Sequence, residues 1–329
     1  MNVLNGKILR IDLPKNKISF EDYKKYKRFL GGRGINQYIL FKELPLGISP
    51  FDPSNMLAVG VGILAGTSAP GSCRVNIDTK NVLTGGIGSS NAGGNFAPEM
   101  RFAGINNIII TGKSKNLVYL LIEDNKIEIK DAFHLKQKTV SETEKIIKKD
   151  IGNDFQIMCI GPAGENLVRS ACIIVNGTRA AGRCGTGAVM GSKNLKAIAV
   201  KGSGDIEVKN PKKFENIVEE CTEKLNKSEF SKLVKKYGVY SVTEPWGIES
   251  PYRNFSGEVP SLKKKNKILR DEFLKYKVAT RACCEACPIP CWAIYEIDEN
   301  SKIIKVEALQ INDIHNFGAK LDMFDPKLI

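Results

Sequence analysis

The first two hundred residues alternate short apolar runs with glycine-rich stretches. Runs of β-branched and aliphatic residues bounded by Gly, Pro, Asn or Asp are typical of strands. They predict strands over 7–13, 56–61, 107–111, 117–123, 157–160, 168–175 and 196–200. Apolar positions three and four apart predict short helices over 20–30, 35–44, 97–102, 140–149 and 188–194. Because strands and helices never settle into a repeated alternation, the pattern favours an α+β domain over a doubly wound sheet.

The pattern changes after Gly202, where a short Gly/Ser stretch ends the strand-rich part. Asn210 and Pro211 open an amphipathic helix that continues to about residue 225. Its apolar stripe comprises Phe214, Ile217, Val218, Cys221 and Leu225. Downstream apolar residues are spaced helically or irregularly. We therefore expect two domains, 1–203 and 204–329, with the second mostly helical and loop.

Composition narrows the class of protein. The 329 residues are 42% hydrophobic and 26% charged, which excludes a wholly disordered or collagen-like chain. No stretch approaches the ~20 apolar residues of a membrane helix, and the first residues lack the pattern of a signal peptide. We expect a cytoplasmic protein without a membrane partner. The net charge of +13 comes largely from lysines in polar runs such as 263–265, which are more typical of a solvated face than of a nucleic-acid site.

The strongest chemical signal is a cysteine-rich segment. Of nine cysteines, four crowd into residues 283–291, where Cys284, Cys287 and Cys291 have the spacing C-x-x-C-x-x-x-C. Prolines at 288 and 290 prevent a regular helix there. Thiolates at this spacing suit an iron–sulfur cluster or a zinc ion. The chain has no second C-x-x-C and only two histidines, so an iron–sulfur cluster is favoured over zinc, and unliganded core thiols come last.

A cubane cluster takes four ligands, and this segment supplies three in suitable spacing. Cys283 adjoins Cys284, and we expect its side chain to point elsewhere. The fourth ligand would then come from a distant position, from another chain, or from residues that this chain lacks. Without a secretory signal, the nine cysteines argue against a disulfide framework.

Three glycine-rich segments, 66–76, 89–96 and 179–193, could hold a large anionic ligand. Glycines let the backbone approach such a ligand, and Arg74, Arg179 and Arg183 supply positive charge. Each segment alone is more typical of a tight turn. The run from Gly60 to Ala65 is similar to a dinucleotide fingerprint but lacks the following helix, and no P-loop order occurs around Gly191. Neither NAD nor ATP is supported.

Taken together, these segments resemble the tungsten-containing aldehyde ferredoxin oxidoreductase family. The similarity rests on Gly66-Thr67-Ser68-Ala69-Pro70, Asn91-Ala92-Gly93-Gly94, Ile160 to Leu167, residues 179–196 and the cysteine segment, and it runs from about Gly6 to Leu321. It implies an N-terminal domain of two β-sheets that forms the base for a bis-pyranopterin carrying tungsten, or occasionally molybdenum. It also implies helical domains, a 4Fe–4S cluster, and transfer of electrons from aldehydes to ferredoxin.

The resemblance also implies roles for individual residues. The main-chain carbonyls of Asn91 and Ala180 would bind the Mg²⁺ that joins the two pterin phosphates. Gly93 and Arg179 would contact the pterins, and Arg74 would lie between pterin and cluster. Cys284, Cys287 and Cys291 match three cluster ligands. We therefore expect the arginine-bearing loops and the cysteine segment to face one common hollow.

The sequence also departs from the family. Family members are longer, and their second pterin-binding segments, a substrate histidine and the fourth cluster cysteine match positions beyond Ile329. Asn312 stands where the family has its proposed catalytic glutamate, so we assign no catalytic residue. We expect the chain to be inactive alone. We also expect an exposed apolar face where the helical lid should dock, which favours self-association into a possible homo-oligomer.

Three alternatives stay open. The chain could be a non-catalytic cofactor-binding or electron-transfer subunit that a second chain completes. It could belong to a tungstopterin reductase that acts on another substrate, such as an aromatic thioester. The third alternative is a zinc-stapled α+β protein.

Overall fold

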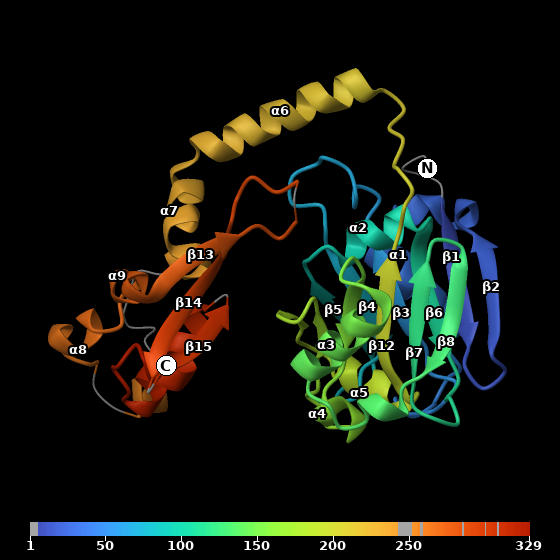
Figure 1. Cartoon of the computed structure of the whole chain (residues 1–329), viewed down its shortest axis with the longest axis horizontal. Helices are drawn as coiled ribbons and strands as arrows, with labels where there is room; N and C mark the ends of the chain where they lie inside the picture. Colours follow the sequence, from blue (N-terminus) through green and yellow to red (C-terminus); the bar gives the residue numbers. More distant parts are fainter. Residues whose placement is uncertain (1–5, 243–251, 257–258, 285, 300, 308) are drawn as a thin grey trace. The chain divides into compact units, whose positions relative to one another are not determined.

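The computed structural model describes residues 6–242, 252–256, 259–284, 286–299, 301–307 and 309–329. The chain forms two compact units, Met1–Glu215 and Asn216–Ile329, whose elements are labelled in Figure 1. The division falls within helix α6 (Pro211–Lys227). The domain boundary expected between residues 203 and 204 stays a prediction.

The first unit contains two six-stranded mixed sheets. One has the order β2-β1-β6-β3-β4-β5 and the other has the order β11-β10-β9-β12-β7-β8. Each sheet has one parallel pair, β1 with β6 and β12 with β7, and its other neighbours are antiparallel. The first sheet comprises β1 (Lys7–Asp12), β2 (Lys17–Asp22), β3 (Leu57–Val61), β4 (Val75–Lys80), β5 (Ile87–Ala92) and β6 (Ile105–Thr111). The second comprises β7 (Val118–Glu123), β8 (Lys126–Asp131), β9 (Gln156–Cys159), β10 (Ile173–Val175), β11 (Arg179–Ala181) and β12 (Leu195–Lys201).

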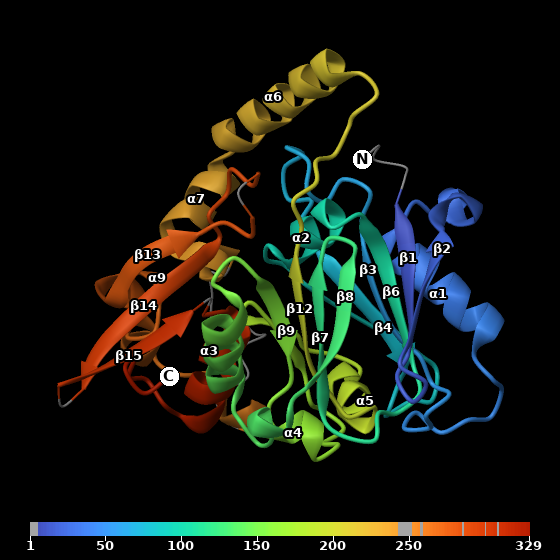
Figure 2. The ribbon, with the colours of Figure 1, turned by 45° about the vertical axis from the view of Figure 1, so that its right-hand side comes forward.

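Short helices connect and cover these sheets. They are α1 (Gly32–Glu43), α2 (Phe96–Phe102), α3 (Val140–Ile151), α4 (Pro162–Glu165) and α5 (Thr186–Ser192), with 3-10 turns at Tyr23–Phe29 and Phe133–Leu135. Figure 2 shows α1 outside the first sheet and α3 outside the second. Helix α3 begins with a capping box, in which Thr139 and Glu142 bond each other's main-chain N–H groups.

The main core lies between the two sheets. It joins apolar side chains of both sheets with those of α2 and α5, including Ile108, Leu120, Phe96 and Val189, all fully buried. Two smaller cores fill the outer faces, one under α1 and one under α3. Because central strands such as β3, β6 and β12 are buried on two faces, they read as largely apolar runs rather than as alternating ones.

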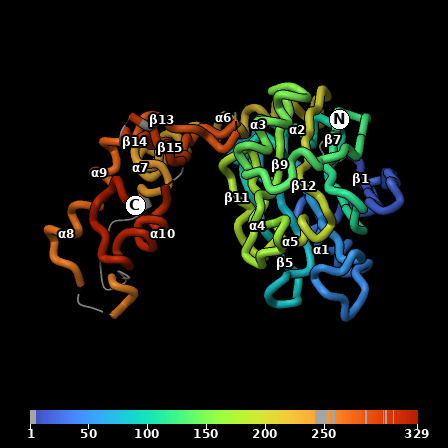
Figure 3. Tube along the Cα trace, turned by 60° about the horizontal axis from the view of Figure 1, so that its bottom comes forward, coloured from blue at the N-terminus to red at the C-terminus, as the bar shows by residue number. Residues whose placement is uncertain are grey.

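The second unit combines short helices with a small sheet. Its three strands are β13 (Lys277–Arg281), β14 (Trp292–Glu299) and β15 (Lys302–Glu307), which pair antiparallel in that order. The helices are α7 (Glu229–Tyr237), α8 (Leu262–Asn266), α9 (Arg270–Phe273) and α10 (Ile311–Asp313), with short 3-10 or π turns at Gly238–Val242, Tyr252–Phe255, Leu274–Tyr276, Ile314–Gly318 and Ala319–Leu321. In Figure 3 the traces of the three strands run together beside α7. The Tyr295 hydroxyl donates to the Tyr237 carbonyl at 3.3 Å and joins sheet to helix.

The α+β class with two sheets and a following, largely helical part is confirmed. The helix predicted over 20–30 is wrong in its first residues, because Phe20 belongs to strand β2, which pairs with β1. The strand predicted over 168–175 is confirmed only for Ile173–Val175. The sheet of the second unit was not predicted. Among the described residues, no helix has the length and apolarity needed to cross a bilayer.

Candidate cofactor site and cysteine loop

The two sheets of the first unit meet at their edge strands. Strands β5 and β11 are the terminal strands of their sheets, and they contact each other. The Arg183 N–H donates to Ser90 Oγ at 3.2 Å, and Cys184 Sγ lies 3.6 Å from the Ser89 carbonyl oxygen. The second and third glycine-rich segments are therefore neighbours in space, although about ninety residues separate them in the chain.

Arg74 and Asn91 form one side of this junction. Arg74 precedes β4, and Asn91 lies in β5 opposite Asn76. The Arg74 guanidinium donates to Asn91 Oδ1 at 2.9 Å through Nε, and its Nη2 donates to the same oxygen. The bond is exposed, so it orients a cationic side chain at the surface of the junction.

Gly94 and Arg179 form the other side. Gly94 has φ +111°, and a Cβ atom there would lie 2.6 Å from Asn176 Oδ1 and 3.3 Å from Arg179 Cδ. The backbone after β5 therefore passes so close to Arg179 that only glycine fits without a shift. Asn176 Oδ1 is itself buried and accepts no hydrogen bond from the residues that the structure describes.

This junction offers groups of the kind that a hard cation and a phosphate-bearing ligand bind. Asn91 and Ala180 both lie in strands whose outer side has no ladder partner among the described strands. Such an edge leaves main-chain groups unpaired, and Mg²⁺ prefers oxygen ligands such as carbonyls. At Gly182 an added Cβ would meet only Ala180 Cβ at 3.9 Å and Cys172 Sγ at 4.0 Å, so the surface beside β11 is open.

A buried polar network holds β4, the strand that Arg74 precedes. Asp78 is fully buried and accepts from Asn36 Nδ2 at 2.8 Å and from Gln37 Nε2 at 3.3 Å. Asn36 in turn accepts from Asn107 Nδ2 at 2.7 Å. Burial raises the pKa of Asp78, against the lowering effect of its hydrogen bonds. Sequence reasoning missed these residues, because an Asp or Asn in a strand gives no signal of its partners.

Two lysines near the third glycine-rich segment are structural. Lys193 is fully buried, and its ammonium donates to the carbonyls of Asn55, Pro53 and Gly112. Burial lowers the pKa of Lys193 to about 8. Lys196 forms a buried ion pair with Glu165, the two atoms lying 2.5 Å apart. Glu165 belongs to one of the motifs on which the family resemblance rests. In this structure its ion pair joins α4 to strand β12.

The first glycine-rich segment borders a cavity of about 580 Å³. Gly66, Thr67 and Ser68 line it on one side, and residues 205–209, 211 and 214–215 line it on the other. Its charged groups include Asp205, Glu207 and Lys209, so the lining has no single sign of charge. The charges of this lining therefore do not favour an anion.

In the second unit, the predicted cysteine ligands lie in the loop between β13 and β14. Two tight turns shape this loop: the Cys287 N–H donates to the Cys284 carbonyl at 3.1 Å, and the Cys291 N–H donates to the Ile289 carbonyl at 2.9 Å. Burial, followed by smaller effects that include a hydrogen bond with Cys283, raises the pKa of Cys287.

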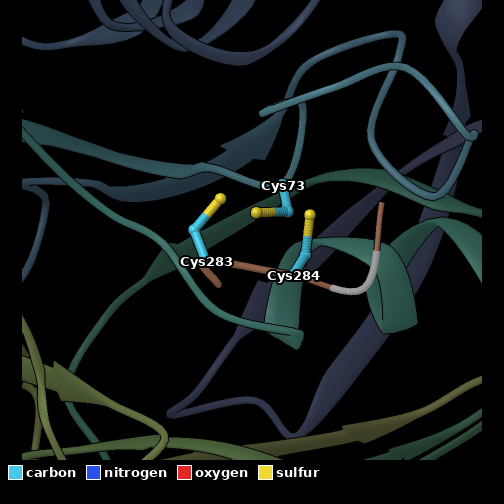
Figure 4. Close-up of side chains that lie close together, drawn as sticks. All are labelled: Cys73, Cys283 and Cys284. Carbon is cyan, nitrogen blue, oxygen red and sulfur yellow. The ribbon is translucent and has the colours of Figure 1, made fainter. Parts of the chain in front are cut away.

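The expectation that Cys283 points away from Cys284 is wrong. The two sulfur atoms lie within 4.8 Å of each other, and Figure 4 shows both directed to the same side of the loop. The loop therefore presents one thiol more than the spacing rule indicated. That the arginine-bearing segments and the cysteine loop share one hollow stays a prediction.

The folds of the two units define a class of protein: one with a two-sheet domain whose edge strands β5 and β11 meet, and with a second unit whose hairpin loop is rich in cysteine. A family model for the aldehyde ferredoxin oxidoreductase N-terminal domain matches residues 8–202. The chain belongs to the aldehyde ferredoxin oxidoreductase family.

Curated relatives are similar to this chain beyond the N-terminal domain as well. The chain is 39% identical to the tungsten-containing aldehyde ferredoxin oxidoreductase of Pyrococcus furiosus, over 97% of this chain and 53% of the relative. The Pyrococcus abyssi enzyme of the same name is 43% identical over 87% of this chain and 48% of the relative. An aliphatic sulfonate oxidoreductase WOR-like subunit of Pyrococcus furiosus is 36% identical over 78% of this chain and 44% of that relative.

A solved structure agrees with the fold. The active-site complex BamBC of benzoyl coenzyme A reductase, in complex with 1,5-dienoyl-CoA, has a TM-score of 0.79 and 28% identity, covering 98% of this chain and 50% of that one. The chain spans about half the length of the curated relatives it matches. The individual roles predicted for Arg74, Asn91, Gly93, Arg179 and Ala180 stay predictions, as do those of the three cluster cysteines.

Proposed function

We propose that this chain forms the tungstopterin base and the cluster loop of an oxidoreductase that oxidises aldehydes to carboxylic acids and passes the electrons to ferredoxin. The net reaction is RCHO + H₂O → RCOOH + 2H⁺ + 2e⁻. Family membership supports the cofactor class, since the curated relatives are described as tungsten-containing. The observation that carries the proposal is the contact between β5 and β11, which brings together the two segments expected to bind the pterins.

In this proposal the protein orients and insulates, while the bound metallopterin supplies the oxygen-atom and electron chemistry. The carbonyls of Asn91 and Ala180 hold Mg²⁺, which neutralises the pterin phosphates. Gly93 and Arg179 contact the pterins, and the guanidinium of Arg74 stays beside Asn91. Cys284, Cys287 and Cys291 bind the iron–sulfur cluster, and hydrogen bonds to its sulfurs tune its potential. The cytoplasmic location is part of the same proposal.

Cofactor analysis tests this proposal. The chain is purified without oxygen from a tungstate-supplied host, and tungsten, magnesium and oxidised pterin are measured per chain. We expect pterin to accompany the chain, and Arg179→Ala to reduce pterin content at least fivefold. Arg28→Ala is the matched control, because Arg28 lies in a 3-10 turn of the same unit and its guanidinium lies over the rings of Phe29 and Tyr38. Equal pterin in both variants, or none in the parent chain, would contradict the proposal.

A second candidate keeps the same sites but divides the enzyme between two chains. It is favoured by the relative described as a WOR-like subunit. In that arrangement this chain binds cofactor and transfers electrons, and a partner polypeptide completes the cage. Affinity purification of the tagged chain from its native cells would recover one stoichiometric partner if the enzyme is divided, and no partner if it is not.

A third candidate is a tungstopterin reductase acting on an aromatic thioester. The solved benzoyl coenzyme A reductase complex, 28% identical to this chain, is the observation that supports it. Assays of the cofactor-loaded protein with an aldehyde and with an aromatic thioester, each with a low-potential dye, separate the two reactions. Reduction of the thioester without oxidation of the aldehyde would favour this candidate over the first.

Self-association is a further element of the proposal. The second unit carries large apolar side chains that are more than half exposed, among them Phe255, Leu262, Phe317 and Leu321. Exposed apolar surface of this kind favours association. Light scattering at increasing protein concentration measures it, and a monodisperse monomer that binds no hydrophobic dye would contradict the expectation.

A further inference from the structure

A second cavity of the first unit, of about 370 Å³, lies at one end of the second sheet. Four stretches of chain line it: the residues before β7, the turn after β8, and the ends of α4 and α5. Figure 2 shows α4 and α5 together at the lower end of this sheet. Cavities of this size are typical of sites for small molecules. The proposed function assigns no ligand to it.

The charges that line this cavity are positive on balance. Lys115 precedes β7 and Lys136 follows the 3-10 turn Phe133–Leu135, and both lysines are exposed. Among the described residues that line the cavity, Glu165 is the only acid, and Lys196 neutralises it in the buried ion pair at 2.5 Å. Two ammonium groups therefore remain to attract an anion.

An exposed aromatic ring accompanies these lysines in the lining. The Phe133 side chain is 68% exposed, and Lys136 Nζ lies 5.9 Å from its ring centroid. Two hydrogen bonds shape the turn that carries both residues: the Phe133 N–H donates to Asp131 Oδ1 at 3.0 Å, and the Lys136 N–H donates to the Phe133 carbonyl at 3.0 Å. The turn therefore keeps an apolar ring and an ammonium next to each other at the cavity. A flat ligand that carries an anionic group matches this pair.

Amide side chains complete the lining. Asn116 and Asn166 are exposed, and each amide can both donate and accept hydrogen bonds. Gln137 is held in place, since its main-chain N–H and its Nε2 donate to Glu165 Oε2 at 3.0 and 3.2 Å. The φ of Gln137 is +58°, a conformation that residues with a side chain rarely adopt and that is enriched at ligand sites.

We propose that this cavity binds a small anion that carries a flat ring, either a nucleoside monophosphate or an aromatic carboxylate. The anionic group pairs with Lys115 and Lys136, and the ring stacks on Phe133. The amides of Asn116 and Asn166 bond the polar edge of the ligand. Phosphate and carboxylate share the chemistry that ammonium groups recognise. This inference is independent of the proposed function, because none of the residues predicted to bind pterin, Mg²⁺ or cluster lines the cavity.

The experiment measures binding to the whole chain by ligand-observed nuclear magnetic resonance and calorimetry, with adenosine 5′-monophosphate and benzoate as probes. We expect at least one probe to bind, with an affinity that falls as salt is added. The neutral analogues adenosine and benzamide should bind about tenfold more weakly, because they lack the charge. The probe that binds supports the inference and identifies the anion. If neither probe binds, or if the neutral analogues bind equally well, the inference is overturned.

A pair of lysine variants tests whether the probe occupies this cavity. Lys136→Ala should weaken binding about tenfold, since a charged hydrogen bond to the anion is lost. Lys113→Ala is the matched control, because Lys113 is an exposed lysine of the loop before β7 that does not line the cavity. Equal affinities of the two variants would place the probe elsewhere and overturn the inference.

A pair of phenylalanine variants tests the stacking. Phe133→Ala should weaken binding about fivefold, because the ligand ring loses its aromatic partner. Phe41→Ala is the matched control, since Phe41 of α1 is 76% exposed, has Lys42 Nζ 5.8 Å from its ring centroid, and lies outside the lining. Far-UV circular dichroism checks that each variant is folded. If Phe133→Ala binds the probe as tightly as Phe41→Ala does, the flat-ring part of the inference is wrong.

Discussion

The buried ion pair between Glu165 and Lys196 offers a sharp test of how the first unit is held together. Lys196 lies in β12 with a fully buried side chain, and the Glu165 side chain is 7% exposed. Lys196 Nζ also donates to the Lys138 carbonyl at 2.8 Å, and Glu165 accepts the Gln137 N–H at 3.0 Å. The pair thus joins α4, the segment before α3 and the second sheet.

Replacing Glu165 by Gln keeps the shape and an acceptor oxygen but removes the negative charge. Breaking one side of a buried pair costs about 3–5 kcal/mol, because the remaining charge stays buried without its counter-ion. Since Lys196 keeps the Lys138 carbonyl, we expect the lower end, about 3 kcal/mol. For a unit of this size that corresponds to a fall in the midpoint of thermal unfolding of about 6–12 °C.

Urea and thermal unfolding of the chain, followed by circular dichroism, measure this loss. Glu123→Gln is the matched control, because Glu123 and Lys201 form a half-exposed contact at 3.9 Å that also involves strand β12. An exposed pair of this kind contributes less than about 1 kcal/mol. If Glu165→Gln and Glu123→Gln unfold at the same urea concentration, the buried pair does not stabilise the unit and the reasoning is refuted.

Three further predictions use other buried groups. Burial lowers the pKa of Lys193 to about 8, so between pH 8 and 10.5 the folded state binds fewer protons than the unfolded state. The free energy of unfolding should therefore rise with pH in this range, by up to about 3 kcal/mol. Urea unfolding of Lys193→Met should lack this rise. Gly94→Ala should destabilise the chain more than Gly47→Ala in the same assay, since both have positive φ but only Gly94 has atoms within 4 Å of an added Cβ. Burial raises the pKa of the Cys159 thiol to about 12, so iodoacetamide at pH 8 should label exposed Cys221 and leave Cys159 unmodified, as mass spectrometry would detect. An unchanged pH slope, equal losses at the two glycines, or labelling of native Cys159 would contradict these expectations in turn.

The sequence predicted the apolar strands well, for a physical reason. The runs that became β3, β6, β7 and β12 are buried on both faces, so most of their side chains are apolar and the run is visible without knowledge of its partners. The helices α1, α2, α3 and α5 were also anticipated within a few residues, because each packs an apolar stripe against a sheet.

Strands β4 and β5 were not anticipated, because their polar residues match a loop. Asn76 and Asp78 of β4 are nevertheless buried, and their side chains bond to one another and to α1. Strand β5 reads Ile-Gly-Ser-Ser-Asn-Ala, a composition typical of a turn. What makes it a strand is pairing with β4, a partner that composition does not reveal. Long-range pairing thus overrode local preference.

The position of Cys283 was also beyond sequence reasoning. The rule that neighbouring side chains diverge holds for an extended chain, and the sequence offers no sign that the backbone bends at Cys283 and Cys284. The bend follows from closure of the hairpin at Arg281 and Trp292, which is a property of the sheet. The sheet in turn was missed because its strands are only partly buried and carry many charged residues.

The location of the candidate cofactor segments follows from what a sheet can offer. A central strand uses its N–H and C=O groups in two ladders, so it has no main-chain oxygen left for a cation. An edge strand keeps one side unpaired, which exposes the protein to association with other strands. In the first unit β5 and β11 are both edge strands and meet each other, so that each partly covers the other. A ligand that bound their remaining carbonyls would satisfy groups that the fold leaves open. Removal of such a ligand should therefore loosen this junction first, and amide hydrogen exchange in residues 87–96 and 179–185 should rise more on cofactor removal than exchange in β1 or β12.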